Sequence, residues 1–379
     1  MQRYDEDLAQ CNRDIELDPG DALAVASRGA MYRRMERYDE ALADFTRAVE
    51  LDPGYAGAIA SRGEIYGLMQ RYDEALADLN RAIELNPRLT RAIASRGEIY
   101  RVLKRHDEAL ADFTRATELD PGDARAIVTR GATYWEMKRY EEALADFSRL
   151  ITINSSSRWA IAKRGESYRL LKRYDEALAD FNRAIELDPG YAWAIASRGQ
   201  VYQAMRRYDE ALADFTRAVE LDPGDTRAIA RRGEVYRAMK RYEEALADFS
   251  RLIELDPSQK KLAIAWRGHT YYLLKRYDQA LADFTRAIDL DPGYVWAIAI
   301  RGESYRLLKR YDEALADLNR AIELDPGYGW AIASRSKTYG QMKRYGKALA
   351  DLKRLLNLRP QRQASRDLAE DPSSATITE

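Results

Sequence analysis

The chain contains one cysteine and only two histidines among its 379 residues. The single cysteine, Cys11, cannot form a disulfide within the chain. This is typical of proteins in a reducing compartment, so we expect a cytoplasmic location. His106 and His269 are far apart in the sequence and fall on different helix faces, so they do not indicate a shared catalytic site. We therefore expect neither a bound metal nor a cofactor.

A net charge of one sign and long apolar runs are also missing. There are 61 Lys and Arg residues against 62 Asp and Glu residues. The chain as a whole therefore has no field that would hold a nucleic acid or an anionic membrane surface. No run of about eighteen apolar residues occurs, and Met1 is followed by polar residues, so neither a membrane span nor a signal peptide is visible. These absences disfavour nucleic-acid and membrane partners.

What the chain does have is a repeat of 34 residues, most easily seen in its prolines. The period predicts a half repeat over 1–21, ten tandem repeats over 22–362, and a tail over 363–379 that forms a short helix or is disordered. The step from Pro257 to Pro292 is one residue longer, so we expect an insertion near 258–261 that the loop absorbs. The marker positions are Pro19, Pro53, Pro87, Pro121, Ser155 in place of proline, Pro189, Pro223, Pro257, Pro292, Pro326 and Pro360.

Each repeat shows the spacing of two amphipathic helices. Val25, Gly29 and Tyr32 recur at intervals of three and four residues, which predicts one buried stripe on a first helix. The second helix has its own stripe, and acidic residues occupy its first turn, where they suit the helix dipole. Proline in the following Asp-Pro-Gly ends it. The second stripe consists of Tyr38, Ala41, Leu42, Phe45, Ala48 and Val49.

The pattern Gly-x-x-Tyr, followed by alanine, an aromatic residue and proline at fixed intervals, resembles the tetratricopeptide repeat over roughly nine-tenths of the chain. The amino-acid sequence of the repeats is similar to that of bacterial members of this family. The resemblance implies an all-α fold in which antiparallel helix pairs stack into an open right-handed superhelical solenoid. It also implies that the first helices form the concave inner wall.

One position departs from the family pattern. The residue before the recurring glycine is usually aliphatic in the family, but here it is arginine in all ten repeats, from Arg28 to Arg335. An aspartate follows sixteen residues later each time, as Asp44 follows Arg28. Because a buried guanidinium needs a partner, we predict an Arg–Asp pair within every repeat. The alternative is that the arginine stem packs while its head reaches solvent.

The ends of the array differ from its interior. In the half repeat, Asp7 and Asp14 replace alanines, which suits a solvent-facing cap. The alternative is that the sequence begins inside a repeat. At the other end, Ser336 replaces the recurring glycine and Gly346-Lys347 replaces Asp-Glu. Self-association through the repeat ends is therefore possible.

The residues that vary between repeats fall on the exposed stripe of the first helices, where binding specificity would diverge. Trp and Arg carry much of the binding energy at interfaces. Two alternatives remain open: Glu and Arg three residues apart pair with each other, or the tryptophans pack on the preceding loop tyrosine. The candidate partner-binding residues are Trp159, Trp193, Glu166, Arg169, Trp135, Trp296, Trp330, Arg306, Trp266 and Tyr272.

The carboxylates recur in every repeat, whereas catalytic acid–base chemistry would be expected once, and no glycine-rich phosphate loop occurs. The chain is therefore not predicted to be an enzyme. We expect a non-catalytic scaffold that binds a peptide or protein partner along the concave groove, with Trp159 and Trp193 as the main contact. The alternative is a structural, self-associating segment or an interaction module of a larger multidomain protein.

Overall fold

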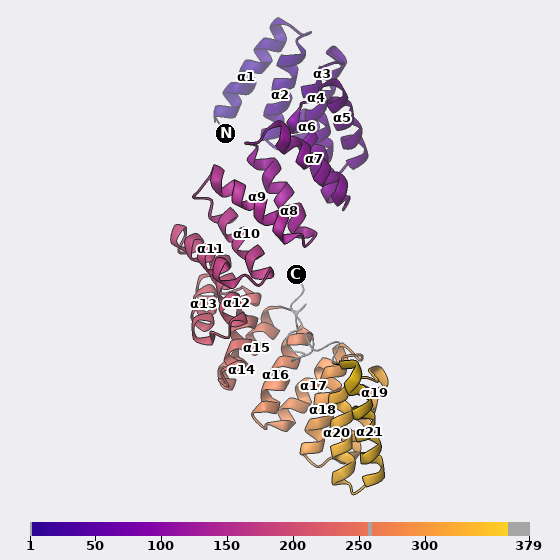
Figure 1. Ribbon diagram of the computed structural model, residues 1–379. Helices are drawn as coiled ribbons and strands as arrows, with labels where there is room; N and C mark the ends of the chain where they lie inside the picture. Colours follow the sequence, from indigo (N-terminus) through magenta and orange to yellow (C-terminus); the bar gives the residue numbers. More distant parts are fainter. Residues whose placement is uncertain (1, 257–259, 363–379) are drawn as a thin grey trace. The chain divides into compact units, whose positions relative to one another are not determined.

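The computed structural model describes residues 2–256 and 260–362, and within them all regular structure is α-helical (Figure 1). The first helices of the repeats are α2 (Ala22–Arg34), α4 (Ala56–Leu68), α6 (Thr90–Val102), α8 (Ala124–Glu136), α10 (Arg158–Leu170), α12 (Ala192–Ala204), α14 (Thr226–Ala238), α16 (Lys260–Leu273), α18 (Val295–Leu307) and α20 (Gly329–Gln341). The half repeat contributes α1 (Gln2–Leu17). The second helices are α3 (Tyr38–Leu51), α5 (Tyr72–Leu85), α7 (His106–Leu119), α9 (Tyr140–Ile153), α11 (Tyr174–Leu187), α13 (Tyr208–Leu221), α15 (Tyr242–Leu255), α17 (Tyr277–Leu290), α19 (Tyr311–Leu324) and α21 (Tyr345–Arg362).

The helices form two compact units, Met1–Asp188 with α1 to α11 and Pro189–Glu379 with α12 to α21. Each unit is a solenoid of helix pairs, as the sequence predicts. That all ten repeats form one continuous right-handed superhelix remains a prediction. The predicted tail over 363–379 lies outside the described residues.

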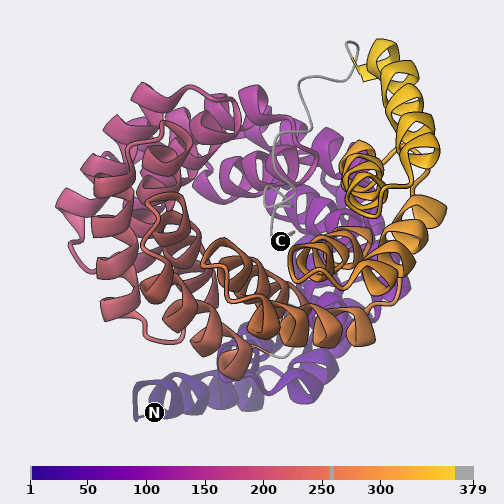
Figure 2. The same cartoon turned by 90° about the horizontal axis from the view of Figure 1, so that it is seen from below.

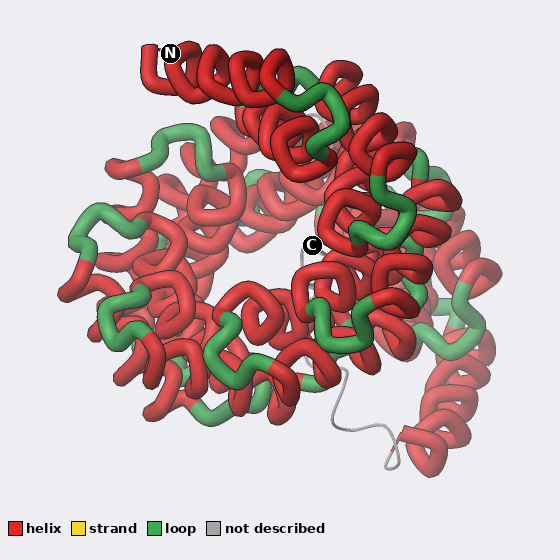
Figure 3. The backbone as a smooth tube through the Cα atoms, turned by 90° about the horizontal axis from the view of Figure 1, so that it is seen from above, coloured by secondary structure: helices red, strands yellow, loops and turns green. Residues whose placement is uncertain are grey.

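Within each unit, the two helices of a repeat pack on each other, and each first helix also packs on the second helix of the preceding repeat. Short loops join the helices (Figure 3). Neighbouring first helices also contact each other, as α4 does α6 and α18 does α20. In the described residues, no pair of neighbouring second helices makes contacts of similar extent. The first helices are therefore more closely spaced than the second helices, as expected for the inner side of a curved stack. We call the solvent-exposed face of the first helices the wall.

The predicted insertion is accommodated differently from our expectation. The first helices elsewhere have 13 residues, and α16 has 14. The described part of the inserted stretch, Lys260 and Lys261, is helical, so the extra residue lengthens the helix start instead of the loop. Residues 257–259 lie outside the described part of the chain.

The turn between the two helices of a repeat is a Schellman-type end with a non-glycine residue in the left-handed region. In the third repeat Lys104 has φ 61°, and the Arg105 amide donates to the Tyr100 carbonyl at 2.8 Å. The Arg105 guanidinium then lies 4.4 Å from the centroid of the Tyr100 ring and binds Glu108 at 2.8 Å. These contacts hold the turn in place, which lets lysine occupy a conformation that usually favours glycine.

The recurring glycine lets the two helices of a repeat approach closely. A Cβ at Gly233 would lie 2.7 Å from Phe249 Cε1, too close for any real contact. The facing Phe or Leu side chains are buried in every repeat before the last. In the last repeat Ser336 fills the glycine position, and its hydroxyl donates to the Ala348 carbonyl at 2.9 Å.

The predicted Arg–Asp pairs are confirmed in all ten repeats. Arg164 is typical: its Nε donates to Asp180 Oδ2 and its Nη2 to Asp180 Oδ1, both at 2.7 Å. This bidentate bond raises the pKa of the Arg164 guanidinium. The pairs are Arg28–Asp44, Arg62–Asp78, Arg96–Asp112, Arg130–Asp146, Arg164–Asp180, Arg198–Asp214, Arg232–Asp248, Arg267–Asp283, Arg301–Asp317 and Arg335–Asp351.

Two further arginine contacts join neighbouring repeats, and sequence reasoning did not find them. Arg96 Nη1 reaches back to the preceding second helix and donates to Asn80 Oδ1 at 2.7 Å. An arginine on the second helix, such as Arg115, donates to the carbonyl of the proline that ends the preceding second helix, here Pro87 at 2.7 Å. The register between repeats therefore rests on directed hydrogen bonds as well as on apolar packing.

Candidate functional site

The charged residues of the wall in the first unit bind one another across neighbouring first helices. Glu64 of α4 accepts hydrogen bonds from Arg33 of α2, from Arg91 of α6 at 2.7 and 2.5 Å, and from Ser95 at 3.0 Å. This bond raises the pKa of the Arg91 guanidinium. The wall between α2 and α6 is therefore largely charge-neutralised by its own side chains.

The predicted Glu and Arg site residues also pair with each other. Arg169 binds Glu166 at 2.6 Å and Arg306 binds Glu303 at 2.5 Å, each three residues apart on one helix. Both glutamates are buried. The hydrogen bond that Arg306 donates to Glu303 raises the pKa of the Arg306 guanidinium, and this effect exceeds the opposing effect of burial. The alternative of mutual pairing is confirmed for these residues.

Two of the predicted tryptophans lie on the wall of the first unit. Trp159, at the start of α10, is 36% exposed and meets Phe147 edge to face at 5.8 Å. Trp135 of α8 is half-buried, with the Lys163 ammonium 5.1 Å from its ring centroid and Tyr140 edge-on at 6.2 Å. Its indole Nε1 is buried without a hydrogen-bond partner. Such an unpaired donor is uncommon in protein interiors. This part of the wall therefore has a hydrogen-bond donor that lacks an acceptor.

The tryptophans of the second unit are more deeply packed than predicted. Trp193 and Trp330 are half-buried, and each ring packs on the loop tyrosine two residues earlier, Tyr191 and Tyr328. Trp296 does the same with Tyr294 and is only 8% exposed. The predicted alternative, in which these tryptophans pack on the preceding loop tyrosines, is therefore confirmed.

Trp266 is not available to a partner, so the prediction for it is wrong. It is 2% exposed and packs on Phe249 at 5.8 Å. The physical reason is its helix position: it directly follows the buried Ala265 and lies one residue before Arg267, on the face that packs against the preceding repeat. Its large side chain fills the joint between α15 and α16 instead of the wall.

The predicted pair Trp159 and Trp193 belongs to two different compact units. Each residue is described within its own unit, so a joint contact remains a prediction. On the first unit, Trp159, Glu166 and Arg169 come from the same helix, α10, and Trp135 comes from the neighbouring first helix.

A histidine-centred aromatic cluster was missed. His269 stacks on Tyr272 at 6.0 Å and meets Trp296 edge to face at 5.4 Å, and His269 Nδ1 lies 2.8 Å from Arg237 Nη1. Burial raises the pKa of Tyr272, and it raises that of nearby Tyr294 to about 12. Tyr272 and Trp296 of this cluster are among the predicted site residues, whereas His269 is not. Histidine at the position that is Glu or Gln in most other repeats is the signal that could have added it.

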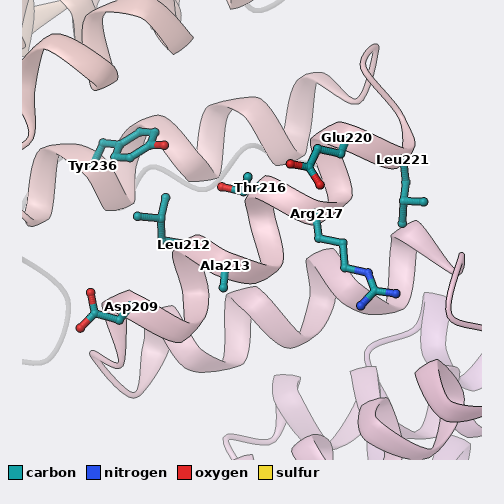
Figure 4. A pocket seen from close by; sticks show the side chains of 8 residues that line it. All are labelled: Asp209, Leu212, Ala213, Thr216, Arg217, Glu220, Leu221 and Tyr236. Atoms are coloured by element: carbon teal, nitrogen blue, oxygen red, sulfur yellow. The ribbon is translucent and has the colours of Figure 1, made fainter.

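The second helices carry a hollow that sequence reasoning also missed. It runs along one face of α13 and ends against Tyr236 of α14 (Figure 4). The lining side chains of α13 recur at three- and four-residue intervals, so this is the outward face of one helix. They are Asp209, Leu212, Ala213, Thr216, Arg217, Glu220 and Leu221.

Within the described residues, no group of three or more His, Cys, Asp or Glu side chains is arranged to hold a metal ion. In the same part of the chain, no helix is both long and apolar enough to span a membrane. Cys11 is half-buried on α1, and burial, with Asp14 and Asp7 nearby, raises the pKa of its thiol. A raised pKa lowers the reactivity expected of a thiol.

The stacked helix pairs and the divergent wall define a helical repeat protein that displays a surface for partners. Comparison with family models agrees: models described as tetratricopeptide repeat match nearly the whole array, and the chain belongs to this family. The matched residues are 22–55, 56–89, 91–123, 124–157, 155–223, 197–260, 263–294, 296–328 and 331–362. It is accordingly a protein-interaction scaffold in general.

Several solved structures are similar to part or most of this chain. YrrB, described as a TPR protein with an unusual peptide-binding site, is 24% identical over 49% of this chain and 95% of its own, with a TM-score of 0.45. A tetratricopeptide repeat protein from Parabacteroides merdae is 19% identical over 66% and 98%, with a TM-score of 0.49. The APC/C hetero-tetramer Cut9–Hcn1 is 15% identical over 97% and 93%, with a TM-score of 0.43. Comparison with curated proteins finds no match.

Proposed function

We propose that this chain is a non-catalytic scaffold that binds an extended peptide or a helix of a protein partner along the wall of its first helices. The core positions are nearly the same in every repeat, whereas the wall positions differ, as expected for a duplicated scaffold that diversified for recognition. The observation that carries the proposal is the exposed Trp159. It presents the largest apolar side chain on a wall whose charges are otherwise mostly paired.

The surroundings of Trp159 support a ligand with both apolar and polar groups. Its edge-to-face contact with Phe147 fixes one side of the ring, so little conformational entropy is lost when a partner covers the other side. Trp135 on the neighbouring first helix offers a buried indole N–H without an acceptor. A ligand that reaches this donor with a carbonyl oxygen would gain a hydrogen bond in a sheltered place.

The proposal is tested with peptides selected from a random phage-displayed library against the full chain. We expect the Trp159→Ala, Trp193→Ala double variant to weaken binding of a selected peptide by at least roughly 2 kcal/mol, the scale of interface hot spots, in isothermal titration calorimetry. Helicity by circular dichroism should change little, because Trp159 is exposed and Trp193 is half-buried.

The matched control is Asp175→Ala, an exposed residue on the second helix α11 of the same repeat as Trp159. Its substitution should leave affinity nearly unchanged. If Asp175→Ala weakens binding as much as the tryptophan pair, the partner uses the second helices, where the α13 hollow lies, and the wall proposal fails.

A further inference from the structure

The last second helix, α21, presents an apolar stripe to solvent that is core in the other repeats. Tyr345, Leu349, Leu352 and Leu356 lie at spacings of four, three and four residues, on one helix face. Their exposed fractions are between 49% and 67%. α21 is the last labelled helix of its unit (Figure 1), and Figure 2 shows the same yellow helix from below.

The preceding repeat shows what normally covers this stripe. Leu318 and Ile322 of α19 stand at the positions of Leu352 and Leu356, and they are 0% and 5% exposed. They form one core cluster with Ala331 and Ile332 of α20, the next first helix. The stripe on α21 therefore corresponds to the surface with which a second helix packs on the next first helix. It can be covered by another helix that has a narrow aliphatic stripe.

The charge around the stripe differs from that of the other second helices. In α19, Arg310 binds Glu313 at 2.9 Å. In α21 the corresponding residues are Arg344 and Lys347, so this ion pair is replaced by two positive charges. Lys353 adds a third where α19 has Asn319. Between Tyr345 and Leu358 the one carboxylate, Asp351, is buried on Arg335. At 3.6 residues per turn, Arg344 and Lys353 lie on the two sides of the stripe. Lys347 lies on the opposite face of α21, with its ammonium 5.6 Å from the centroid of the Tyr339 ring of α20. The stripe is therefore bordered by two basic residues that no carboxylate of α21 neutralises.

Three possible occupants within the same protein fit this surface poorly. The following segment, 363–379, has one leucine, Leu368, before Pro372, whereas the stripe extends about 17 Å along α21. A second α21 would bring Arg344 and Lys353 of one copy against the same basic residues of the other. The α1 helix of a second copy has the right charge, but in its described part the one exposed leucine is Leu17 at the helix end, which cannot match a stripe of four residues. The exposed polar residues of α1 are Glu6, Asp7, Gln10, Arg13, Asp14 and Glu16.

We infer that the exposed face of α21 is a second interaction surface, separate from the wall, and that it binds an amphipathic helix of another protein with an aliphatic stripe and acidic flanks. The aliphatic stripe completes the joint that a next repeat would form. The acidic flanks neutralise Arg344 and Lys353, which gives the site its specificity.

The test uses two synthetic helical peptides about four turns long, with leucines spaced to match the stripe and with either glutamate or lysine on both flanks. Fluorescence anisotropy with the full chain measures their binding. We expect the glutamate peptide to bind at least roughly tenfold more tightly than the lysine peptide. The Arg344→Glu, Lys353→Glu double variant should reverse this preference.

Apolar and folding controls complete the experiment. The Leu352→Gln, Leu356→Gln double variant should abolish binding of the glutamate peptide, with helicity unchanged because both side chains are exposed. Leu324→Gln removes an equally exposed leucine at the end of α19 and should leave binding intact. Equal binding of the two peptides, or binding that survives the double leucine substitution, would overturn the inference. A dimer in sedimentation equilibrium that Leu352→Gln dissociates would assign the surface to a second copy of the chain instead.

Discussion

The arginine before the recurring glycine is a charged residue in a core position. The paired aspartate compensates for the cost of burying its charge. Arg164 and Asp180 satisfy each other through two parallel hydrogen bonds, and Arg164 Nη1 also contacts Ser148 Oγ at 3.3 Å. Removing one member of such a pair leaves the other charge partly desolvated and unpaired. The geometry makes the pair specific, because only a planar guanidinium matches both carboxylate oxygens.

We expect Arg164→Ala to lower the free energy of unfolding by roughly 1–3 kcal/mol, since Asp180 would lose its charged partner in a buried place. Arg173→Ala, in the same repeat, should lower the free energy of unfolding clearly less than Arg164→Ala, because the bond from Arg173 to Glu176 is solvent-exposed. Urea unfolding followed by circular dichroism measures both. Equal losses for the two variants would show that the Arg–Asp pair has no special weight.

The recurring glycine gives a second prediction at a single residue. Gly233→Ala should destabilise the chain by about 1–3 kcal/mol, because its Cβ would lie 2.7 Å from the rigid ring of Phe249. Gly340→Ala is the matched change at a site where nothing lies within 4 Å of the added Cβ. It should be neutral or stabilise by up to about 1 kcal/mol through helix propensity. Thermal unfolding of both variants separates close packing from propensity, and a loss at Gly340 as large as at Gly233 would contradict this reasoning.

At the scale of the helices, the joint between neighbouring repeats depends on a polar residue of the second helix. Asn80 Oδ1 accepts from Arg96 Nη1 at 2.7 Å, and Asn319 Oδ1 accepts from Arg335 Nη1 at 2.8 Å. Thr216 stands at the same position before Arg232, and these two side chains make no such bond. The hollow on α13 lies beside Thr216 (Figure 4). The joint between α13 and α14 therefore lacks a hydrogen bond that the joints at Asn80 and Asn319 have.

We predict that Thr216→Asn stabilises the chain by about 0.5–1.5 kcal/mol, because the longer amide supplies the acceptor that Arg232 Nη1 lacks and fills part of the hollow. Thr285→Asn is the control, since Thr285 Oγ1 already accepts from Arg301 Nη1 at 3.1 Å. Hydrogen exchange of the amides in α13 and α14 should slow in the first variant alone. Slower exchange in both variants, or in neither, would contradict this account of the joint.

At the scale of the whole molecule, the same exposed ion pair recurs at the start of most second helices and links stability to pH. The arginine bond and the helix start lower the pKa of the glutamate in each. A lowered pKa in the folded state gives stability that is present above the unfolded value of 4.5 and is lost as the pH falls through the folded value. The glutamates are Glu40, Glu74, Glu108, Glu142, Glu176, Glu210, Glu244 and Glu313.

We therefore expect the contribution of these glutamates to be constant near neutral pH and to fall once the pH drops below about 4.5. Guanidinium unfolding at several pH values measures the effect. The Glu313→Gln variant should show a shallower loss in acid, because one of the linked groups no longer titrates. An acid dependence that is unchanged in this variant would show that other carboxylates dominate.

The sequence alone was sufficient for the helix pairs and the Arg–Asp pairs. Each of these depends on spacings within one repeat, and ten copies of the same spacing leave little freedom. The pairing of Arg28 with Asp44 could be predicted from the sequence because two antiparallel helices with a three-residue turn bring those positions together. The wall residues could be assigned to a face in the same way, as the exposed Trp159 shows.

Exposure at the joints and ends was decided only by the tertiary structure. Trp159 and Trp296 stand at the same position of their first helices, yet one is 36% and the other 8% exposed. Burial at this position depends on what the preceding first helix places against the ring, here His269 against Trp296. Leu352 has the same local pattern as the buried Leu318, and it is exposed because no following first helix packs on α21 in the described residues. A repeat sequence specifies the interior of each unit, whereas the stacking of neighbours determines which of its equivalent surfaces remain open to a partner.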